Sequence, residues 1–389
     1  MDGQDRRTAL YASAGSRLIH FEVDADDAVL HECATLQLPA DVQYAWPHAS
    51  RRYLYVACSD GNPDSSGSTH WVCALRIDDS GALQAHGAPV ALRWRPLHIT
   101  TDIDSSHLLI TYNVPSMVTV HRLHADGRIG DEVPQSPGLD FGVYAHQVRV
   151  AASNRRLLVV TRGNDAAGDK PEDPGALKLF DYASGRLQFK ASIAPGGGYG
   201  FGPRHLDFHP TQPRVYVSLE RQNRLQVYDF SNEVLAAQAL HSVGTLADDS
   251  HDHSLQKPGT VHVHPNGRFV YVANRARESR LLNGVKVFAG GENNIAVFAI
   301  DQYSGAPVLI QNADIRGIAP RTFALDASGR LLVAANLMPM QVESAQAVTR
   351  VEAGLSMFRV GDDGRLDFVR KIDIDTGKGQ LFWMGMVAL

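Results

Sequence analysis

The sequence predicts an all-β protein, a seven-bladed β-propeller with four-stranded antiparallel blades. The first observation behind this prediction is a short apolar run that recurs along the chain: RRYLYVAC (51–58), SHLLITYN (106–113), RRLLVVTR (155–162), PRVYVSLE (213–220), GRFVYVAN (267–274) and GRLLVAAN (329–336). The central residues of these runs are 55, 49, 57, 55 and 62 residues apart. A period near 50 residues with four strand-like segments in each period is typical of propeller blades.

The second observation is that the other strands follow in register around each run. Within one repeat we expect GTVHVHP (259–265), GRFVYVAN, NNIAVFAID (293–301) and APVLIQNAD (306–314). The fourth and fifth repeats also contain four strand-like segments each, although the fourth segment of the fifth repeat is less regular. A glycine-containing turn recurs at the outer hairpin, as DDSGAL, HADGRI, YASGRL, QYSGAP and GDDGRL. Glycine supplies the positive φ that tight hairpins require.

The chain ends supply the third observation. TALYASAG, RLIHFEVD and VLHECATLQL give the first unit only three strands, and QLFWMGMVAL (380–389) supplies the fourth. Pairing of the N- and C-terminal strands then closes the ring and leaves no exposed sheet edge. We therefore expect residues 1–389 to form a single propeller domain.

Composition excludes several functional classes. The net charge is −5 with no long basic run, so nucleic acid is not expected as a partner. No segment approaches the ~20 apolar residues that span a bilayer, so no membrane association is expected. Cys33, Cys58 and Cys73 lack metal-ligand spacing, and the HDH run at 251–253 is weak evidence for a metal. We expect no cofactor, a cytoplasmic location, and a monomer or small homo-oligomer.

Polar residues gather where strands of adjoining blades begin and end. We call the strands of a blade a to d, from the axis outward. Because neighbouring strands are antiparallel, the start of strand a and the end of strand b lie on the same face of the propeller. This geometry brings together His146, Arg204, His205, Glu220, Arg275 and Arg321. Convergent charged groups at one mouth of the central channel predict a ligand site. Arg162, His98 and Asn336, at equivalent strand ends, are expected to add substrate contacts.

Two further features concern the loops. His209 and His264 each precede a proline in the a–b turn, and we interpret their recurrence as turn structure on the opposite face. Three long segments, 163–175, 276–293 and 338–354, emerge on the same face as Arg275. Long loops on a rigid scaffold commonly carry function, so these segments are expected to form a rim or lid, or alternatively oligomer contacts.

GPRHLDFHP…VYVSLERQNRLQVYDF and HPNGRFVYVANR…IAVFAID…PRTFALDASGRLLVAAN resemble the seven-bladed lactonase family. This family includes propeller-type bacterial 6-phosphogluconolactonases and the fungal carboxy-cis,cis-muconate lactonizing enzyme. The resemblance extends over essentially the whole chain and is strongest over 200–340. It implies catalytic roles for His146 in AHQV, Arg204 in GPRH, Glu220 in SLER and Arg275 in VANR. Tyr144-Ala145-His146 departs from the His-Pro-His or His-Ala-His of many members.

A lactone hydrolase activates a water, stabilises an oxyanion and protonates the ring-opened oxygen. His146 suits acid/base work near neutrality, and Arg204 and Arg275 suit anion clamping. Glu220 between arginines should be ionised and is expected to orient a guanidinium or water, although it remains an alternative proton carrier. We expect hydrolysis of a sugar-acid lactone, either 6-phosphogluconolactone or an aldaric or uronic acid lactone. Alternatives are a carboxymuconate-type cycloisomerase, which also needs anion clamps and one proton carrier, and a non-catalytic interaction scaffold.

Overall fold

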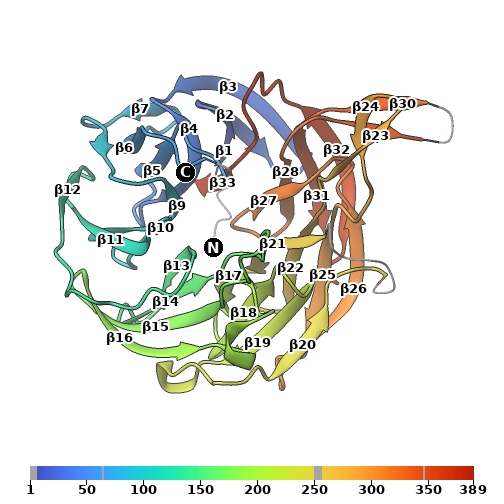
Figure 1. Ribbon diagram of the computed structural model, residues 1–389. Helices are drawn as coiled ribbons and strands as arrows, with labels where there is room; N and C mark the ends of the chain where they lie inside the picture. The colour runs from blue at the N-terminus through green and yellow to red at the C-terminus, as the bar shows by residue number, and fades with distance from the viewer. Residues whose placement is uncertain (1–6, 64, 249–255, 345–346) are drawn as a thin grey trace.

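Seven β-sheets surround a central axis in the computed structural model, which describes residues 7–63, 65–248, 256–344 and 347–389 (Figure 1). Consecutive strands are antiparallel neighbours in each sheet, because short turns join them. The ring closes where β1 (Thr8–Ala14) pairs with β33 (Met384–Ala388), in a register that runs from Thr8 opposite Ala388 to Ala12 opposite Met384. Both the predicted blade architecture and the predicted closure are confirmed.

Each blade begins with the strand nearest the axis, and its other strands follow outward. Blade 1 contains β33, β1, β2 (Arg17–Asp24) and β3 (Val29–Gln37). Blade 2 contains β4 (Asp41–Pro47), β5 (Tyr53–Ser59), β6 (His70–Ile77) and β7 (Leu83–Ala85), and β8 (Val90–Ala91) also pairs with β6. Blade 3 contains β9 (Pro96–Thr101), β10 (His107–Asn113), β11 (Ser116–Leu123) and β12 (Ile129–Glu132). Blade 4 contains β13 (Ala145–Val150), β14 (Arg156–Thr161), β15 (Ala176–Ala183) and β16 (Arg186–Ile193).

The other three blades follow the same order. Blade 5 contains β17 (Pro203–Phe208), β18 (Arg214–Leu219), β19 (Arg224–Asp229) and a short β20 (His241–Gly244). Blade 6 contains β21 (Lys257–Val263), β22 (Phe269–Arg275), β25 (Asn294–Ile300) and β26 (Pro307–Asp314). Blade 7 contains β27 (Pro320–Leu325), β28 (Leu331–Asn336), β31 (Gly354–Val360) and β32 (Leu366–Asp373). Two 3₁₀ turns, η1 (Pro195–Gly198) and η2 (Ser231–Glu233), lie before β17 and β20.

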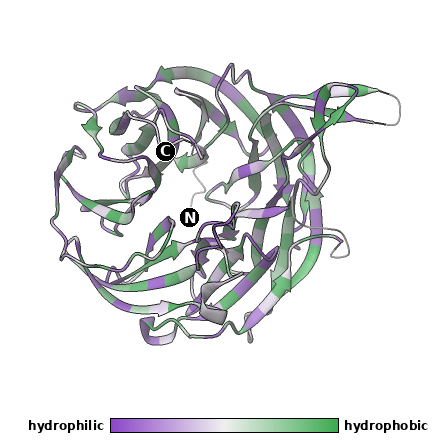
Figure 2. Ribbon diagram, in the orientation of Figure 1, coloured by the Kyte–Doolittle hydropathy of each residue, from purple (hydrophilic) through white to green (hydrophobic). Residues whose placement is uncertain are grey.

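The apolar core lies between neighbouring blades. Tyr55 and Ala57 of β5, for example, pack with Ile99 of β9 and Leu108 of β10, which joins blade 2 to blade 3. In the described part of the chain, one such cluster fills each of the seven blade interfaces. Hydrophobic residues accordingly recur along the strands of every blade (Figure 2). Apolar burial between blades thus holds the inner strands rigidly around the axis.

Hydrogen bonds from one blade to the next repeat around the ring. In four blades, a tyrosine hydroxyl on the second strand donates a hydrogen bond to a glycine carbonyl in the outer hairpin of the following blade, at 2.7–3.1 Å. The pairs are Tyr11 with Gly81, Tyr55 with Gly127, Tyr216 with Gly305, and Tyr271 with Gly364. On the a–b turns, His209 Nε2 lies 2.9 Å from the Gly267 carbonyl and His264 Nε2 lies 2.9 Å from that of Gly329. The two turn histidines therefore have the structural role that their recurrence indicated.

Two of the long segments contain hairpins that project outward from blades 6 and 7. β23 (Ser279–Leu282) pairs with β24 (Val285–Phe288), and β29 (Met340–Glu343) pairs with β30 (Val348–Val351). An Arg280–Glu343 ion pair links the two hairpins, which extend beyond the ring at the upper right of Figure 1. These hairpins point away from the axis and do not cover the central channel as a lid.

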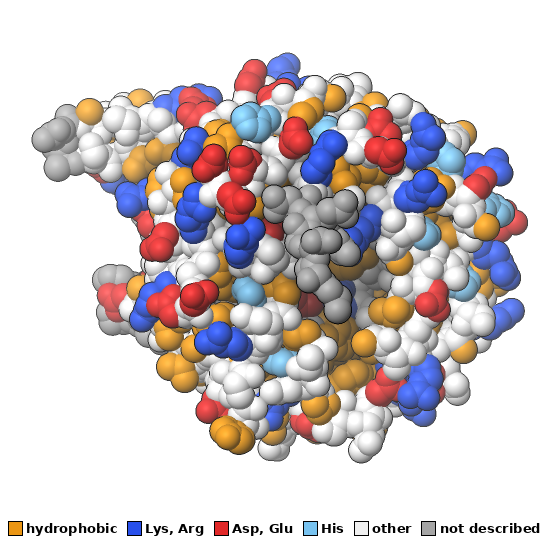
Figure 3. All heavy atoms as spheres, turned by 180° about the vertical axis from the view of Figure 1, so that it is seen from behind, with side chains coloured by type: hydrophobic (Ala, Val, Ile, Leu, Met, Phe, Trp, Pro, Cys, Tyr) orange, Lys and Arg blue, Asp and Glu red, His pale blue; other side chains and the backbone are white. Residues whose placement is uncertain are grey.

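The face seen in Figure 3 carries basic and acidic side chains interspersed around its periphery. That face therefore has no single-sign field of the kind that attracts polyanions. Among the described residues, no helix is long and apolar enough to cross a membrane.

Candidate active site

Irregularities in the innermost strands define where the site forms. In β13, Ala145 pairs with Thr161 and Gln147 with Val160, so His146 has no partner in the ladder. Arg204 is skipped in the same way in β17, and Arg321 is skipped in β27. A β-bulge bends its strand and re-aims the extra side chain. Three bulges of this kind turn one imidazole and two guanidinium groups toward the same end of the channel.

A cavity of about 370 Å³ opens at that end of the channel. Its lining contains seven cationic side chains: Arg95, Arg162, Arg204, Lys257, Arg275, Arg277 and Arg321. The lining also contains three carboxylates (Asp165, Glu220 and Glu278), together with Tyr144, His146 and several apolar side chains. A cavity of this size accommodates a small metabolite, and its excess of positive charge selects for anions.

Glu220 is the centre of the cluster. One carboxylate oxygen accepts hydrogen bonds from Arg275 and from Arg204, the latter at 3.4 Å, and the other oxygen accepts one from Arg162. Burial would raise the pKa of Glu220, but Arg204, Arg162 and Arg275 hold it well below the ordinary range. Glu220 is therefore a carboxylate at neutral pH, and it contacts three guanidinium groups.

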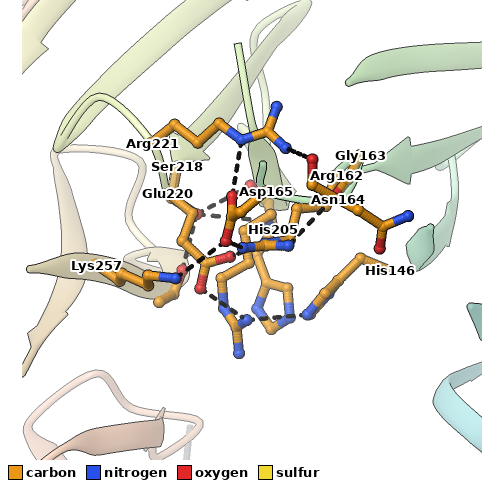
Figure 4. A network of polar contacts seen from close by, with 12 residues as sticks. His146, Arg162, Gly163, Asn164, Asp165, His205, Ser218, Glu220, Arg221 and Lys257 are labelled. Carbon is orange, nitrogen blue, oxygen red and sulfur yellow. Dashed lines mark hydrogen bonds and ion pairs between the residues drawn. The ribbon is translucent and has the colours of Figure 1, made fainter. Parts of the chain in front are cut away.

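Asp165, from the long segment 163–175, forms a second layer of ion pairs. It binds Arg162, lies 3.0 Å from Arg221 Nε and lies 3.3 Å from Lys257 Nζ. Figure 4 shows Asp165 among these cations, with the Glu220 carboxylate beside it at Arg162. Burial opposes ionisation, but Arg162, Arg221 and Lys257 lower the pKa of Asp165 to about 2. This segment thus contributes a fixed charge to the cavity wall.

His146 is buried beside these arginines. Its Nε2 lies 2.9 Å from Arg204 Nη1, and since a guanidinium only donates, Nε2 must be the acceptor. Burial and then the charges of Arg204, Arg321 and Arg162 hold its pKa well below the ordinary value. The imidazole is neutral, with the proton on Nδ1.

Tyr144 has an unusual backbone conformation at the entrance to β13. Its φ is +63°, in the left-handed region that a bulky side chain seldom adopts and that costs on the order of 1–3 kcal/mol. The ring lies parallel to His146, with centroids 6.1 Å apart and planes at 14°, and the Arg162 guanidinium carbon lies 5.4 Å from its centroid. Strain of this kind concentrates at functional sites, and Tyr144 lines the cavity.

Arg321 supplies positive charge without a carboxylate partner among the described residues. Its guanidinium lies 3.5 Å from the centroid of Phe382, and its Nε donates to the Phe382 carbonyl at 3.2 Å. Burial, together with the charges of Arg204 and Arg275, lowers its pKa well below the ordinary value. A cation held in this way is satisfied best by an anionic ligand.

The structure brings together six of the nine residues expected at the site. His146, Arg162, Arg204, Glu220, Arg275 and Arg321 line the cavity. His98 and His205 do not line it; both are buried, with ring centroids 6.1 Å apart. Asn336 is also buried, and its amide donates to Ser356 at 2.8 Å. Burial holds the pKa of His98 and that of His205 well below the ordinary value.

Sequence reasoning missed several lining residues. Tyr144 stands out in the sequence only as a departure from a motif, and Asp165 only as part of a long segment. Arg95, three residues before His98, lines the cavity although no sequence pattern singles out its position. In the described residues, no group of three or more histidine, cysteine, aspartate or glutamate side chains could hold a metal ion; the HDH run at 251–253 lies outside those residues.

Comparisons with known proteins show the family and the fold. Residues 8–353 match the family model described as lactonase, seven-bladed β-propeller. A 6-phosphogluconolactonase of Bacillus subtilis is 28% identical over 84% of this chain and 86% of its own length. Another, from Pectobacterium carotovorum, is 25% identical over 85% of this chain and 88% of its own length.

Solved structures share the fold. The periplasmic gluconolactonase of Pseudomonas aeruginosa superposes with a TM-score of 0.71 at 20% identity, covering 98% of this chain and 99% of that one. A protein from Lactobacillus plantarum gives a TM-score of 0.71 at 19% identity, covering 99% of both chains. Since the family model matches most of the sequence, the chain belongs to the seven-bladed β-propeller lactonase family.

Proposed function

We propose that this protein hydrolyses the lactone of an anionic sugar acid, with arginines as anion clamps. Its family and its curated relatives make it a lactone hydrolase, and two of those relatives are named 6-phosphogluconolactonase. The observation that carries the choice of an anionic substrate is the cavity lining, in which seven cations face three carboxylates. The substrate class is a phosphorylated sugar lactone such as 6-phosphogluconolactone, or an aldaric or uronic acid lactone.

The cavity offers separate places for the two ends of such a substrate. Arg321, without a carboxylate partner among the described residues, would hold the phosphate or carboxylate. Arg204 and Arg275, oriented by Glu220, would face the lactone carbonyl. Charge that develops on the carbonyl oxygen during water attack would be stabilised by these groups.

His146 would accept a proton from the attacking water. Its neutral form has a lone pair on Nε2, which now accepts from Arg204. When a substrate oxygen takes that Arg204 hydrogen bond, Nε2 becomes available to a water. Hydrogen bonds of a catalytic group often rearrange in this way when substrate binds.

Proton release on adding freshly made lactones, with spontaneous hydrolysis subtracted, tests the proposal. The substrates are glucono-, 6-phosphoglucono-, glucaro- and galactaro-lactone, and the proteins are the parent, Arg275→Met and Arg214→Met. We expect fast opening of an anionic lactone, a ~10²–10³-fold loss in Arg275→Met, and no loss in Arg214→Met, whose side chain binds Tyr303 on the outer turn. A folded parent that accelerates none of the four lactones would refute the proposal.

A further inference from the structure

The proposed hydrolysis leaves one chemical task without a residue. When the bond between the carbonyl carbon and the ring oxygen breaks, that oxygen departs as an alkoxide and needs a proton. Glu220 cannot donate one, because three arginines keep it ionised. At rest His146 lacks a proton on the nitrogen that faces Arg204, and the imidazolium that it forms by taking a proton from the attacking water is opposed by the charges of neighbouring arginines.

The charge of the cavity favours a particular kind of acid. Arg162, Arg204 and Arg321 disfavour any group that becomes positive when it gains a proton, as His146 does. The same arginines favour a group that becomes negative when it loses a proton. A neutral acid whose conjugate base is an anion therefore fits this site, and among the lining side chains a phenol has that property.

Tyr144 is the phenol in the described lining. Its side chain is only partly buried, its ring is parallel to His146, and the Arg162 guanidinium lies over the ring face. Its hydroxyl makes no hydrogen bond to another described residue, which leaves it free for a ligand. A negative charge on Tyr144 stabilises the charged forms of Arg204 and Arg321, so the hydroxyl is electrostatically coupled to both arginines.

The backbone supports this assignment independently. The φ of +63° at Tyr144 is one that glycine or asparagine would adopt more easily. The Tyr144 carbonyl accepts the Arg162 N–H at 2.9 Å, which fixes the turn that leads into β13. A strained conformation that places a polar group in a cavity is characteristic of residues retained for their chemistry.

From these relationships we infer that Tyr144 is the general acid, a catalytic residue that the proposed function requires and that the four-residue motif does not contain. The Tyr144 O–H bond breaks as the ring oxygen leaves the carbonyl carbon, and the proton moves to that oxygen to form the free hydroxyl. The resulting phenolate lies under the guanidinium of Arg162 and is attracted by the charges of Arg204 and Arg321. It regains a proton from His146, which carries the one removed from the attacking water. The sum is one lactone and one water converted to one hydroxy acid.

Tyr144→Phe tests this role, because phenylalanine keeps the ring and removes only the hydroxyl. With the lactone that the parent opens fastest, we expect kcat to fall by ~10²–10⁴-fold, the range typical of a lost general acid. KM should change little. Tyr303→Phe, at a side chain that is 94% exposed, is the matched control.

Tyr144→Asn is a second variant, whose side chain suits the left-handed backbone. It should show the same loss of kcat, and it replaces the phenylalanine variant if that variant does not fold. A parent inactive on every lactone would overturn the proposed function, and this inference with it. An active parent together with a variant within about twofold of its kcat would overturn the role of Tyr144 alone.

Discussion

Arg204 donates a hydrogen bond to His146 Nε2 across 2.9 Å, and the two side chains come from the inner strands of adjacent blades. Both residues are bulged out of their ladders, so the contact depends on two local irregularities. The contact fixes the imidazole tautomer and places a cation directly against it. The protonation of His146 is therefore opposed first by burial and then by the charge of a residue that is 58 positions away in the sequence.

Arg204→Met should raise the pKa of His146 toward its ordinary value. The substitution removes the largest of the charges that oppose imidazolium, although burial still disfavours it. Titration of His146 by histidine-selective NMR measures the change, and Arg214→Met on the outer surface is the control. An unchanged His146 pKa in the Arg204 variant would show that this contact does not control its protonation.

Asp165→Asn should reduce kcat/KM by ~10–100-fold, since hydrogen bonds to charged groups contribute about 1.5–3 kcal/mol. The variant loses the charge that holds Arg162, Arg221 and Lys257. Asp173→Asn is matched to it, because Asp173 lies in the same segment but its carboxylate contacts Asn164 and Lys170, away from the cavity. Steady-state kinetics of both variants test this prediction, and equal losses would argue that the segment acts only through its fold.

Tyr271→Phe should destabilise the propeller by about 1 kcal/mol without affecting catalysis. It removes the 3.0 Å hydrogen bond to the Gly364 carbonyl, and the typical net value of such a bond is about 0.5–1.5 kcal/mol. Urea unfolding measures the change. Tyr216→Phe removes the equivalent 3.1 Å bond to Gly305, so it should cost a similar amount. A negligible effect in both variants would mean that the repeated bonds do not strengthen the blade contacts.

Acidification from pH 7 to pH 5 should destabilise the protein. Burial holds the pKa values of His98, His146 and His205 below the ordinary value near ~6.5 of the unfolded chain. Stability from these groups is thus present above pH ~6.5 and is lost below it, as the unfolded state binds protons that the folded state does not. Each fully buried histidine contributes up to about 1.4 kcal/mol per pH unit.

Urea unfolding at several pH values, with His98→Gln beside the parent, tests the pH dependence. The variant should have a slope smaller by about 1.4 kcal/mol per pH unit. Carboxylates such as Asp165, with a pKa of about 2, act in a more acidic range and do not contribute to this window. Stability that stays constant between pH 7 and pH 5 would be inconsistent with neutral buried histidines.

The repeat was sufficient to predict the blades, because interior strands with turn formers every ~50 residues have few other arrangements. Strand direction then placed His146, Arg204, Glu220 and Arg275 on one face. It could not separate Arg204 from its neighbour His205, since a bulge decides which of two successive residues faces the cavity. The left-handed φ of Tyr144 and the ion pairs of Asp165 arise from tertiary contacts that no local pattern encodes.

The central claim is that the cationic cavity selects anionic sugar lactones. The most direct test compares kcat/KM for 6-phosphogluconolactone with kcat/KM for gluconolactone, at low and at high salt. We predict that the phosphorylated lactone is hydrolysed faster and that its advantage shrinks as salt screens the arginines. We also predict that Arg321→Met removes most of that advantage. Equal rates for the two lactones at every salt concentration would contradict this selection of anions, and hydrolysis of neither these lactones nor glucaro- or galactaro-lactone by the folded protein would contradict the proposed function.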